Sequence, residues 1–528
     1  MEVGEERVEA AAELAVRKLK DLDVRSEKDV QAAKQEAAHD VQSSRIPKNS
    51  DLLRFVDEED GYLRALLTIK PRRNLSGIAV VAAMTKPLPC PPQAQCLYCP
   101  GGMAVSSPKS YTGREPAALR GAQNGYDPFL QVTSRLRQLE DIGHSTAKVE
   151  LIVMGGTFLN FGVDYQEAFV KGLYDALNGR GSKTLQDAIT ANEKADKRCV
   201  GLTVETRPDC LKETDVDRLL SFGGTRVEIG VQSLHDDVLK YVRRGHTVKQ
   251  TAEAFRTARD AGLKIVAHMM PGLPGSTLER DFDSFRTLFE DERFRPDMLK
   301  IYPTLVVRSA PLYEMYIRGE YAPYDTEQMV DLVARVKAIT PPWVRIMRVQ
   351  RDIPAQLIEA GIRASNLREL AQERLRSAGG KCSCIRCREV GLRSIPPGRR
   401  DNFTLRKRAY YASGGEEHFF SYEDEEGDLA AFLRMRVPSQ SAHRPEIDSG
   451  TAIVRELRVY GRLVDLGKRS ATGWQHRGLG AQLMREAEEA ALSSGRTEMI
   501  VISAVGTREY YRRLGYERRG PYMAKRLH

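Results

Sequence analysis

The chain has 528 residues, of which 41% are hydrophobic and 29% are charged, and its net charge is +9. This length predicts two to four domains, and the composition excludes a disordered or fibrous chain. The first residues lack the basic and apolar regions of a secretory signal, and the apolar runs are too short to span a bilayer. We therefore expect a cytoplasmic protein that makes no membrane contact.

The N-terminal region has a helical composition. Residues 1–45 are rich in Ala, Glu, Lys and Gln, which favour helix, and a break that contains a proline follows at 46–51. We expect a small helical region over residues 1–70.

Residues 71–372 alternate between apolar and amphipathic segments. Amphipathic stretches such as 165–177 and 252–261 separate runs rich in Val, Ile and Leu, which are typical of strands covered on both faces. This alternation predicts βαβ units, a parallel sheet and an α/β fold. Six units make a partial (βα)6 barrel rather than the full eight. The expected strands are residues 77–84, 149–155, 200–205, 226–231, 264–270 and 299–305.

Three cysteines follow the first expected strand: Cys90, Cys96 and Cys99. A [4Fe–4S] cluster takes four protein ligands when it is fully coordinated, so a loop with three thiolates leaves one iron open. This is the arrangement that S-adenosylmethionine (SAM) radical enzymes use. A zinc site or a disulfide is the alternative, but no fourth Cys or His follows at zinc spacing, and no export signal favours a disulfide. We interpret this segment as a cluster-binding loop.

Polar groups follow the other expected strands. The active sites of parallel barrels lie at the carboxyl ends of the strands, so we expect these groups to meet over one cofactor-binding mouth. The alternative is that each residue merely caps its own strand, which is less plausible for a whole series of strands. The predicted mouth residues are Gly155, Gly156, Glu205, Gln232, His268 and Lys300.

Residues 374–408 carry eleven Lys and Arg against two acidic residues, so this segment alone has a charge of +9. A concentrated basic stripe in an otherwise balanced chain favours contact with a polyanion, and a solvated linker is the alternative. The second cysteine triplet, Cys382, Cys384 and Cys387, lies in the same stretch. We therefore expect a basic, cysteine-containing linker over residues 373–400.

Residues 401–528 form a smaller α/β pattern. An expected strand at 452–459 precedes a Q-x-x-G-x-G string at 475–480, and an amphipathic helix follows it. Glycines at such a turn let backbone N–H groups and the helix N-terminus approach a pyrophosphate. The string alone could be a plain turn. With a further strand and a helix containing two tyrosines behind it, the unit resembles the acetyl-CoA site of the GNAT acetyltransferase superfamily.

A radical SAM barrel followed by an acetyltransferase domain resembles the family of the catalytic subunit of Elongator, which also occurs as a stand-alone protein in archaea and some bacteria. The resemblance covers residues 72–528. It is carried by the strings at 98–102, 110–113, 154–158, 205–208, 228–233, 300–305, 348–354, 453–457 and 520–523.

The resemblance implies carboxymethylation of the wobble uridine of tRNA at C5, a tRNA uridine acetyltransferase activity. SAM would yield a 5′-deoxyadenosyl radical, which abstracts hydrogen from the methyl group of acetyl-CoA. The carbon radical then adds to C5, and thioester hydrolysis leaves the carboxymethyl group. The implied partners are the tRNA anticodon stem-loop, which residues 1–70 are also candidates to bind, and either Elongator-like subunits or a second copy of the chain.

The resemblance also assigns residues to roles. Cys90, Cys96 and Cys99 take the cluster positions. Cys382, Cys384 and Cys387 take those of a zinc site, for which a second iron–sulfur cluster is the competing interpretation. The candidates for a fourth zinc ligand are His443, His418 and His268.

The same resemblance supplies an acetyl-CoA site. Its catalytic candidates are Lys148, Tyr510 and Tyr511, although an exposed lysine and a tyrosine pair packed in the core are the plain alternatives. We expect Lys148 and residues 475–480 to lie on opposite walls of one closed cleft, which the radical site shares. The acetyl-CoA-binding candidates are Lys148, Glu456, Leu457, Arg458, Val459, Gln475, Gly478, Leu479, Gly480, Ala481 and Tyr511.

Two other functions remain open from the sequence. One is a protein lysine acetyltransferase with a structural iron–sulfur domain and Glu456 as general base. The other is a non-catalytic nucleic-acid scaffold. The polar strand ends argue against an inert barrel, and a cationic surface should repel a cationic substrate. The sequence therefore favours the tRNA-modifying enzyme.

Overall fold

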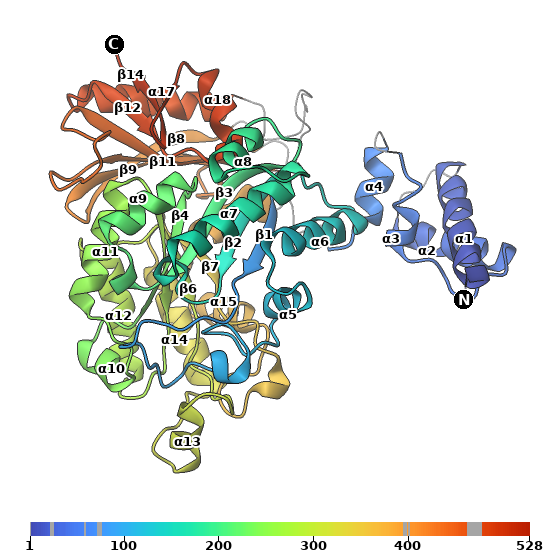
Figure 1. Cartoon of the computed structure of the whole chain (residues 1–528), viewed down its shortest axis with the longest axis horizontal. Coiled ribbons are helices and arrows are strands. Elements are labelled where there is room, and N and C mark those ends of the chain that lie inside the picture. Colours follow the sequence, from blue (N-terminus) through green and yellow to red (C-terminus); the bar gives the residue numbers. More distant parts are fainter. Residues whose placement is uncertain are drawn as a thin grey trace.

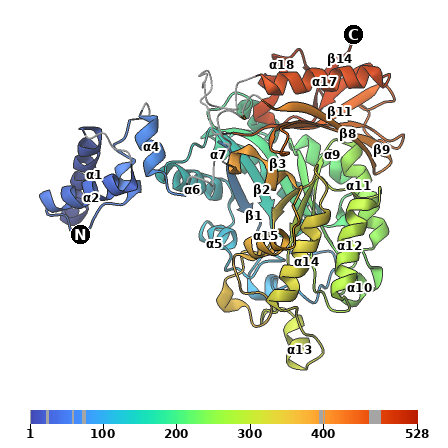
Figure 2. The same ribbon diagram turned by 180° about the vertical axis from the view of Figure 1, so that it is seen from behind.

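The computed structural model describes residues 2–21, 26–57, 60–70, 77–393, 399, 402–461 and 478–528. Four N-terminal helices stand to one side of the main body (Figures 1 and 2) and pack around a small core of their own that includes Ala15, Leu19 and Leu63. None of the described helices is long and apolar enough to cross a membrane. The four helices are α1 (Glu2–Asp21), α2 (Glu27–Asp40), α3 (Asn49–Leu52) and α4 (Gly61–Leu67).

The largest part of the chain is a partial barrel. Its sheet has seven parallel strands in sequence order, so the expected open barrel of parallel strands is confirmed with one strand more than the sequence indicated. The additional strand, β7, has four residues and only Ile346 is fully buried, so it carries no apolar run to reveal it. The strands are β1 (Ala79–Met84), β2 (Lys148–Met154), β3 (Arg198–Thr206), β4 (Arg226–Gln232), β5 (Lys264–Met269), β6 (Met298–Ile301) and β7 (Arg345–Arg348).

Helices cover the outer face of this sheet (Figures 1 and 2). Successive strand residues point to opposite faces, so Val149, Leu151 and Val153 pack outward while the residues between them face the barrel interior. This alternation leaves the inner face available for polar side chains. The α-helices of this part of the chain are α5 (Pro116–Gln123), α6 (Pro128–Asp141), α7 (Val163–Asn178), α8 (Leu185–Asn192), α9 (Glu213–Ser221), α10 (Asp236–Tyr241), α11 (Val248–Asp260), α12 (Leu278–Glu290), α13 (Leu312–Ile317), α14 (Thr326–Ile339) and α15 (Leu367–Ser377). Of these, α13 projects from the end of the barrel (Figure 1).

A second seven-stranded sheet follows, with strand order β13-β14-β12-β11-β10-β9-β8. β11 and β12 run parallel and pair only as far as Val454 and Val501, after which β11 continues to Val459 with only β10 as its partner. This divergence opens the sheet next to the first turn of α17. The elements are α16 (Ile385–Arg388), β8 (Thr404–Ala412), β9 (Gly415–Glu423), β10 (Leu429–Val437), β11 (Thr451–Val459), α17 (Leu479–Ser493), β12 (Glu498–Val501), α18 (Arg508–Arg512), β13 (Glu517–Arg519) and β14 (Tyr522–Arg526).

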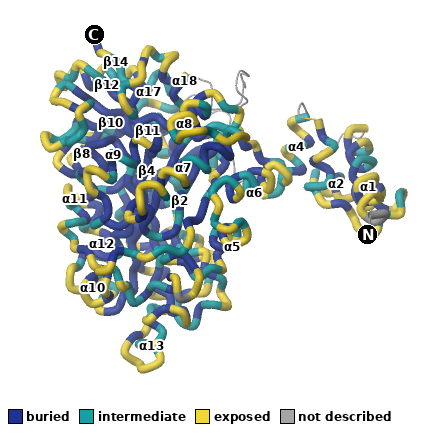
Figure 3. Tube along the Cα trace, in the orientation of Figure 1, coloured by how far each residue is buried: buried dark blue, intermediate teal, exposed yellow. Residues whose placement is uncertain are grey.

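Buried ion pairs join the two sheets. Arg455 of β11 donates to Asp297, which precedes β6, at 2.9 Å, and Arg436 of β10 donates to Asp260 at the end of α11 at 2.6 Å. All four side chains are almost fully buried. In Figure 3 most strands of the two sheets are buried, whereas α13 and the N-terminal helices present exposed stretches, and β8 at the edge of the second sheet is also largely exposed. A buried charge that loses its partner is strongly destabilising, so these pairs fix how the two sheets meet.

Candidate active site

The first cysteine triplet lies between β1 and α5, at the carboxyl end of the barrel. Cys90, Cys96 and Cys99 are half-buried and line a cavity of about 440 Å³. Their thiols are more widely spread than those of the second triplet, since among the described residues only Cys382, Cys384 and Cys387 bring three ligand atoms within 4.8 Å of one another. A four-iron cube holds each thiolate at a separate corner, so a wider spacing fits a cluster better than a single ion.

The surroundings of these thiols favour a thiolate. The guanidinium of Arg244 lies 3.6 Å from Cys96 Sγ. Burial opposes ionisation, but the Arg244 charge outweighs it and holds the pKa of the Cys96 thiol below its usual value. The backbone N–H of Ser110 donates to Cys99 Sγ at 3.3 Å. Arg244 follows α10 with no recognisable motif around it, and the sequence analysis did not find it.

Two buried carboxylates lie in the same mouth. Glu205 accepts hydrogen bonds from the Tyr111 hydroxyl at 2.8 Å and from the backbone N–H of Gly155 at 3.3 Å. Glu228 contacts Lys300 and lies 2.9 Å from Nε2 of His268. Burial disfavours the charge of Glu228, yet Lys300 and His268 hold the pKa of this carboxyl below its usual range. The mouth therefore holds fixed charges in a partly enclosed space.

The structure brings the predicted mouth residues together. Gly156, Glu205, Gln232 and His268 line the cavity, while Lys300 reaches it through its contact with Glu228. Gly155 supplies a backbone donor, and its φ of +133° together with a distance of 2.0 Å from an added Cβ to Thr85 Oγ1 requires glycine. These polar groups share one cavity, as the prediction of a common mouth requires.

A second cavity, of about 740 Å³, lies between the amino ends of the barrel strands and the second sheet. Lys148, which begins β2, lines it together with Tyr510 and Tyr511, and so do Glu456 to Val459 and Gly478 to Ala481. All the acetyl-CoA-binding candidates within the described residues therefore meet here. Gln475 lies outside the described residues.

The local geometry of this second cavity suits an anionic ligand. Gly478 has a φ of +80° and directly precedes the fifteen-residue helix α17, so the N-terminus of that helix opens on the cavity. A Cβ on Gly480 would come within 2.7 Å of the Tyr510 hydroxyl, so a larger residue there would require the tyrosine side chain to shift. Burial raises the pKa of Tyr510, so the tyrosine keeps its proton. Burial also lowers the pKa of Lys148.

The two cavities lie at opposite ends of the barrel strands, and they share no lining residue among the residues that the structure describes. Lys148 and Gly480 of the glycine turn therefore share a cavity as expected, whereas the cluster loop lines a different cavity. The reason is that the second sheet docks on the amino ends of the barrel strands, through long-range ion pairs such as that between Arg455 and Asp297.

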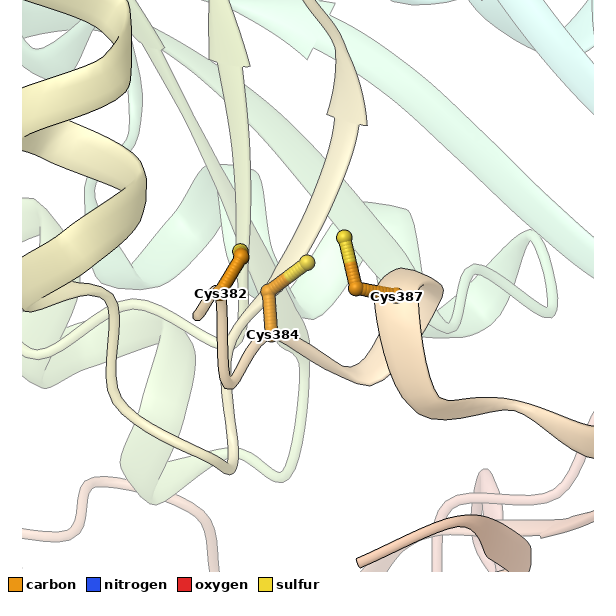
Figure 4. A group of neighbouring side chains, drawn as sticks. All are labelled: Cys382, Cys384 and Cys387. Atoms are coloured by element: carbon orange, nitrogen blue, oxygen red, sulfur yellow. The ribbon is translucent and has the colours of Figure 1, made fainter. Parts of the chain in front are cut away.

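The second cysteine triplet is compact. The thiols of Cys382, Cys384 and Cys387 point toward one another (Figure 4), and hydrogen bonds from its two neighbours hold the pKa of the Cys384 thiol well below its usual value. Three close thiols, one of them readily ionised, can bind a metal ion. Lys337 Nζ and Gln372 Oε1 each lie 3.7 Å from Cys387 Sγ.

None of the expected histidines joins this group among the described residues. Instead His443 Nε2 lies 2.9 Å from Asp217, His268 lies beside Glu228, and His418 Nε2 lies 3.4 Å from Glu416. The candidates for a fourth ligand were thus wrong, because each histidine already has an acidic neighbour in another part of the fold.

The basic segment is largely neutralised in the folded chain. Arg374 pairs with Glu327 and Asp331, and Arg408 binds Glu423 with both terminal nitrogens at 2.7 and 2.8 Å. Arg393 and Arg399 contact acidic residues between β9 and β10. Arg400 lies outside the described residues. The stripe seen in the sequence therefore presents much less free charge than its composition indicates.

The fold and the two cavities define a chain with a radical SAM domain and an acetyltransferase domain. Residues 91–287 match the radical SAM superfamily, 296–377 match the radical SAM C-terminal domain, and 392–516 match the acetyltransferase (GNAT) family. The first implies SAM and an iron–sulfur cluster, and the last implies acetyl-CoA.

Similar proteins define the family more closely. A protein of Methanocaldococcus jannaschii named tRNA uridine(34) acetyltransferase is 46% identical over 91% of this chain and 90% of its own length. The human Elongator complex protein 3 is 45% identical over 96% and 94%. A solved structure of the Methanocaldococcus infernus Elp3 lacking its N-terminus aligns with a TM-score of 0.76 and 43% identity, over 85% of this chain and 99% of that one. The chain belongs to the Elongator protein 3 family.

Proposed function

We propose that this protein carboxymethylates the wobble uridine of tRNA at C5, using acetyl-CoA and SAM. The observation that carries the proposal is that one chain holds two separate cavities, one with a three-cysteine loop and one with a GNAT-type glycine turn. The names of the similar proteins, tRNA uridine(34) acetyltransferase among them, supply the substrate. The cavities supply sites for the two other reactants.

Cys90, Cys96 and Cys99 are the residues that would hold a [4Fe–4S] cluster, with Arg244 favouring the thiolate form of Cys96. A cluster held in this way supplies the electron that cleaves SAM to a 5′-deoxyadenosyl radical. The chain's own contribution at the mouth is to bind and orient. Glu205, held by Tyr111, offers fixed acceptor oxygens to the hydroxyl and amino groups of a nucleoside.

The second cavity would hold acetyl-CoA. The backbone N–H groups at the start of α17 suit the pyrophosphate. The edge of β11 that β12 no longer pairs, along Glu456 to Val459, offers backbone groups to the pantetheine arm. Tyr510 and Tyr511 are protonated donors for the thioester, and we assign Lys148 to the acyl-CoA site as well. Exclusion of water from this cavity would protect the thioester from untimely hydrolysis.

We also propose zinc at the second triplet and tRNA contacts along residues 1–70 and the unpaired part of the basic segment. Three clustered thiols leave one tetrahedral position, which water or a ligand from outside the described residues would fill. All eight cysteines are free, which suits a reducing compartment such as the cytoplasm. Elongator-like subunits or a second copy of the chain remain candidate partners.

The lysine acetyltransferase alternative finds less support in the geometry. It would need Glu456 as a general base, but Arg434 Nε donates to this carboxylate at 2.9 Å. Although burial opposes its charge, Arg434 and Lys264 hold the pKa of Glu456 below its usual value. A carboxylate held in this way is a weak proton acceptor at neutral pH, since a general base works best with a pKa near the working pH.

The test is anaerobic reconstitution with SAM, a reductant, acetyl-CoA and tRNA, followed by mass spectrometry of the digested nucleosides. We expect carboxymethyluridine at the wobble position with the wild-type protein and none with Cys99→Ala. Acetylated lysine in a protein substrate, with unmodified tRNA and a fully loaded cluster, would favour the acetyltransferase alternative instead.

A further inference from the structure

The linings of the two cavities approach each other along the inner face of the barrel. On β2, Lys148 and Glu150 line the second cavity and Met154 lines the mouth, so Ile152 is the one inward residue between them. On β3, Thr203 lines the second cavity and Glu205 the mouth. Residues two apart along a strand are separated by about 7 Å, so only one layer of side chains divides the cavities.

That intermediate layer is not packed. Ile152 and its pairing partner Ala82 on β1 are only half-buried, and Val80, one step nearer the second cavity, is 51% exposed. In a closed barrel such inward residues would pack into a filled core. Here the barrel has seven strands and stays open beside β1, so Val80, Ala82 and Ile152 form an accessible apolar wall on the inner face.

The facing wall is polar. Arg226 on β4 donates to Glu150, yet its Nε has no hydrogen-bond partner among the described residues, and neither do Thr203 Oγ1 and Glu228 Oε1. Buried polar atoms without partners are unfavourable in a dry core, so these atoms favour a space that admits water or a ligand. Opposite Glu150, Gly201 keeps the space free, since a Cβ there would lie 3.2 Å from Glu150 Cγ.

We propose that the inner face of β1–β4 forms a passage that joins the two cavities, with Ile152 at its midpoint, and that the acyl end of a coenzyme A thioester enters it. An apolar wall on one side and hydrogen-bonding groups on the other suit a short acyl chain with a carbonyl group. The inference rests on the proposed use of acetyl-CoA, and it explains how reactants held at opposite ends of the barrel meet. Ile152 and Glu150 act in it as positioning residues.

The test measures how the affinity of the full-length protein for coenzyme A thioesters depends on acyl chain length. Isothermal titration calorimetry is performed with CoA, acetyl-CoA, butanoyl-CoA and hexanoyl-CoA. In the wild-type protein, affinity should rise with chain length, by at most about fourfold per methylene group. Ile152→Phe should remove the rise from acetyl to hexanoyl and leave CoA affinity unchanged. Ile152→Val, which widens the passage, should keep the rise.

Val163→Phe is the matched control, because it adds the same ring to an exposed aliphatic residue on the outer helix α7. Unchanged CoA affinity in Ile152→Phe shows that the second cavity is still folded. A wild-type affinity that falls with chain length, or a rise that survives in Ile152→Phe, would overturn the passage. The measurement needs neither cluster nor tRNA, so it stands apart from the nucleoside assay, whose failure would reject the proposed function alone.

Discussion

Asp297 is one of the buried carboxylates that hold the junction between the two sheets. It precedes β6, is fully buried, and accepts hydrogen bonds from Arg455 at 2.9 Å and from the backbone N–H of Ile265 at 2.9 Å. Arg434 lies 3.6 Å away. Asp297→Asn keeps the size of the side chain and removes its charge. The buried guanidinium groups of Arg455 and Arg434 then lose one of their negatively charged partners.

The expected loss in the free energy of unfolding depends on which ion-pair partners remain after the substitution. Removing one member of a buried ion pair costs about 3–5 kcal/mol. After Asp297→Asn, Arg455 still contacts Glu417 at 2.9 Å and Arg434 still contacts Glu456 at 2.9 Å, so we expect the lower end of that range. Burial opposes the charge, but Arg455 and Arg434 hold the pKa of Asp297 far below its usual value. A depressed pKa stabilises the fold above the unfolded pKa, near 4, and this contribution is lost only as the pH falls through the folded pKa.

The assay is urea denaturation followed by tryptophan fluorescence. Trp343 stacks on Tyr410 of the second sheet with 4.2 Å between ring centroids, so its emission reports on the junction. We expect the unfolding midpoint of Asp297→Asn to drop at pH 7, and the gap from wild type to narrow in strong acid. Glu279→Gln, which breaks the exposed pair with Arg335, should leave the midpoint unchanged. A wild-type midpoint for Asp297→Asn at pH 7 would refute the reasoning.

Three further predictions concern the sites. Cys99→Ala should abolish cluster iron and tRNA modification while acetyl-CoA still binds in calorimetry; iron retained at the wild-type level would contradict the cluster assignment. Gly480→Leu should weaken acetyl-CoA binding at least tenfold, because its Cβ would crowd the Tyr510 hydroxyl at 2.7 Å, and it should leave cluster iron unchanged in elemental analysis. Cys384→Ala should remove about one zinc per chain without changing iron content; unchanged zinc would contradict the site.

Most of the fold could be predicted from local sequence patterns. Six of the barrel strands were predictable because each contains an apolar run, whereas β7 has only Ile346 fully buried and gave no such pattern. The cysteine loop and the glycine turn before α17 were also predictable from short stretches of sequence. The position of the second sheet could not be predicted in this way, because it depends on contacts such as that between Arg436 and Asp260, which lie 176 residues apart.

The same limit applies to charge. The basic segment looked free in the sequence because the acidic partners of Arg374 and Arg399 lie 25 to 47 residues away and come close only in the fold. His443 was a plausible metal ligand for the same reason, since its contact with Asp217 spans 226 residues. Such pairings follow from tertiary structure, and residue spacing does not encode them.

Isotope transfer tests the central claim most directly. Acetyl-CoA carrying a fully deuterated methyl group is incubated anaerobically with the protein, SAM, a reductant and tRNA, and the products are analysed by mass spectrometry. If both cavities serve one reaction, 5′-deoxyadenosine gains one deuterium and the wobble uridine gains a carboxymethyl group that carries two. Unlabelled 5′-deoxyadenosine alongside labelled carboxymethyluridine would contradict hydrogen abstraction from the acetyl group, and with it the account of two cavities acting on one substrate.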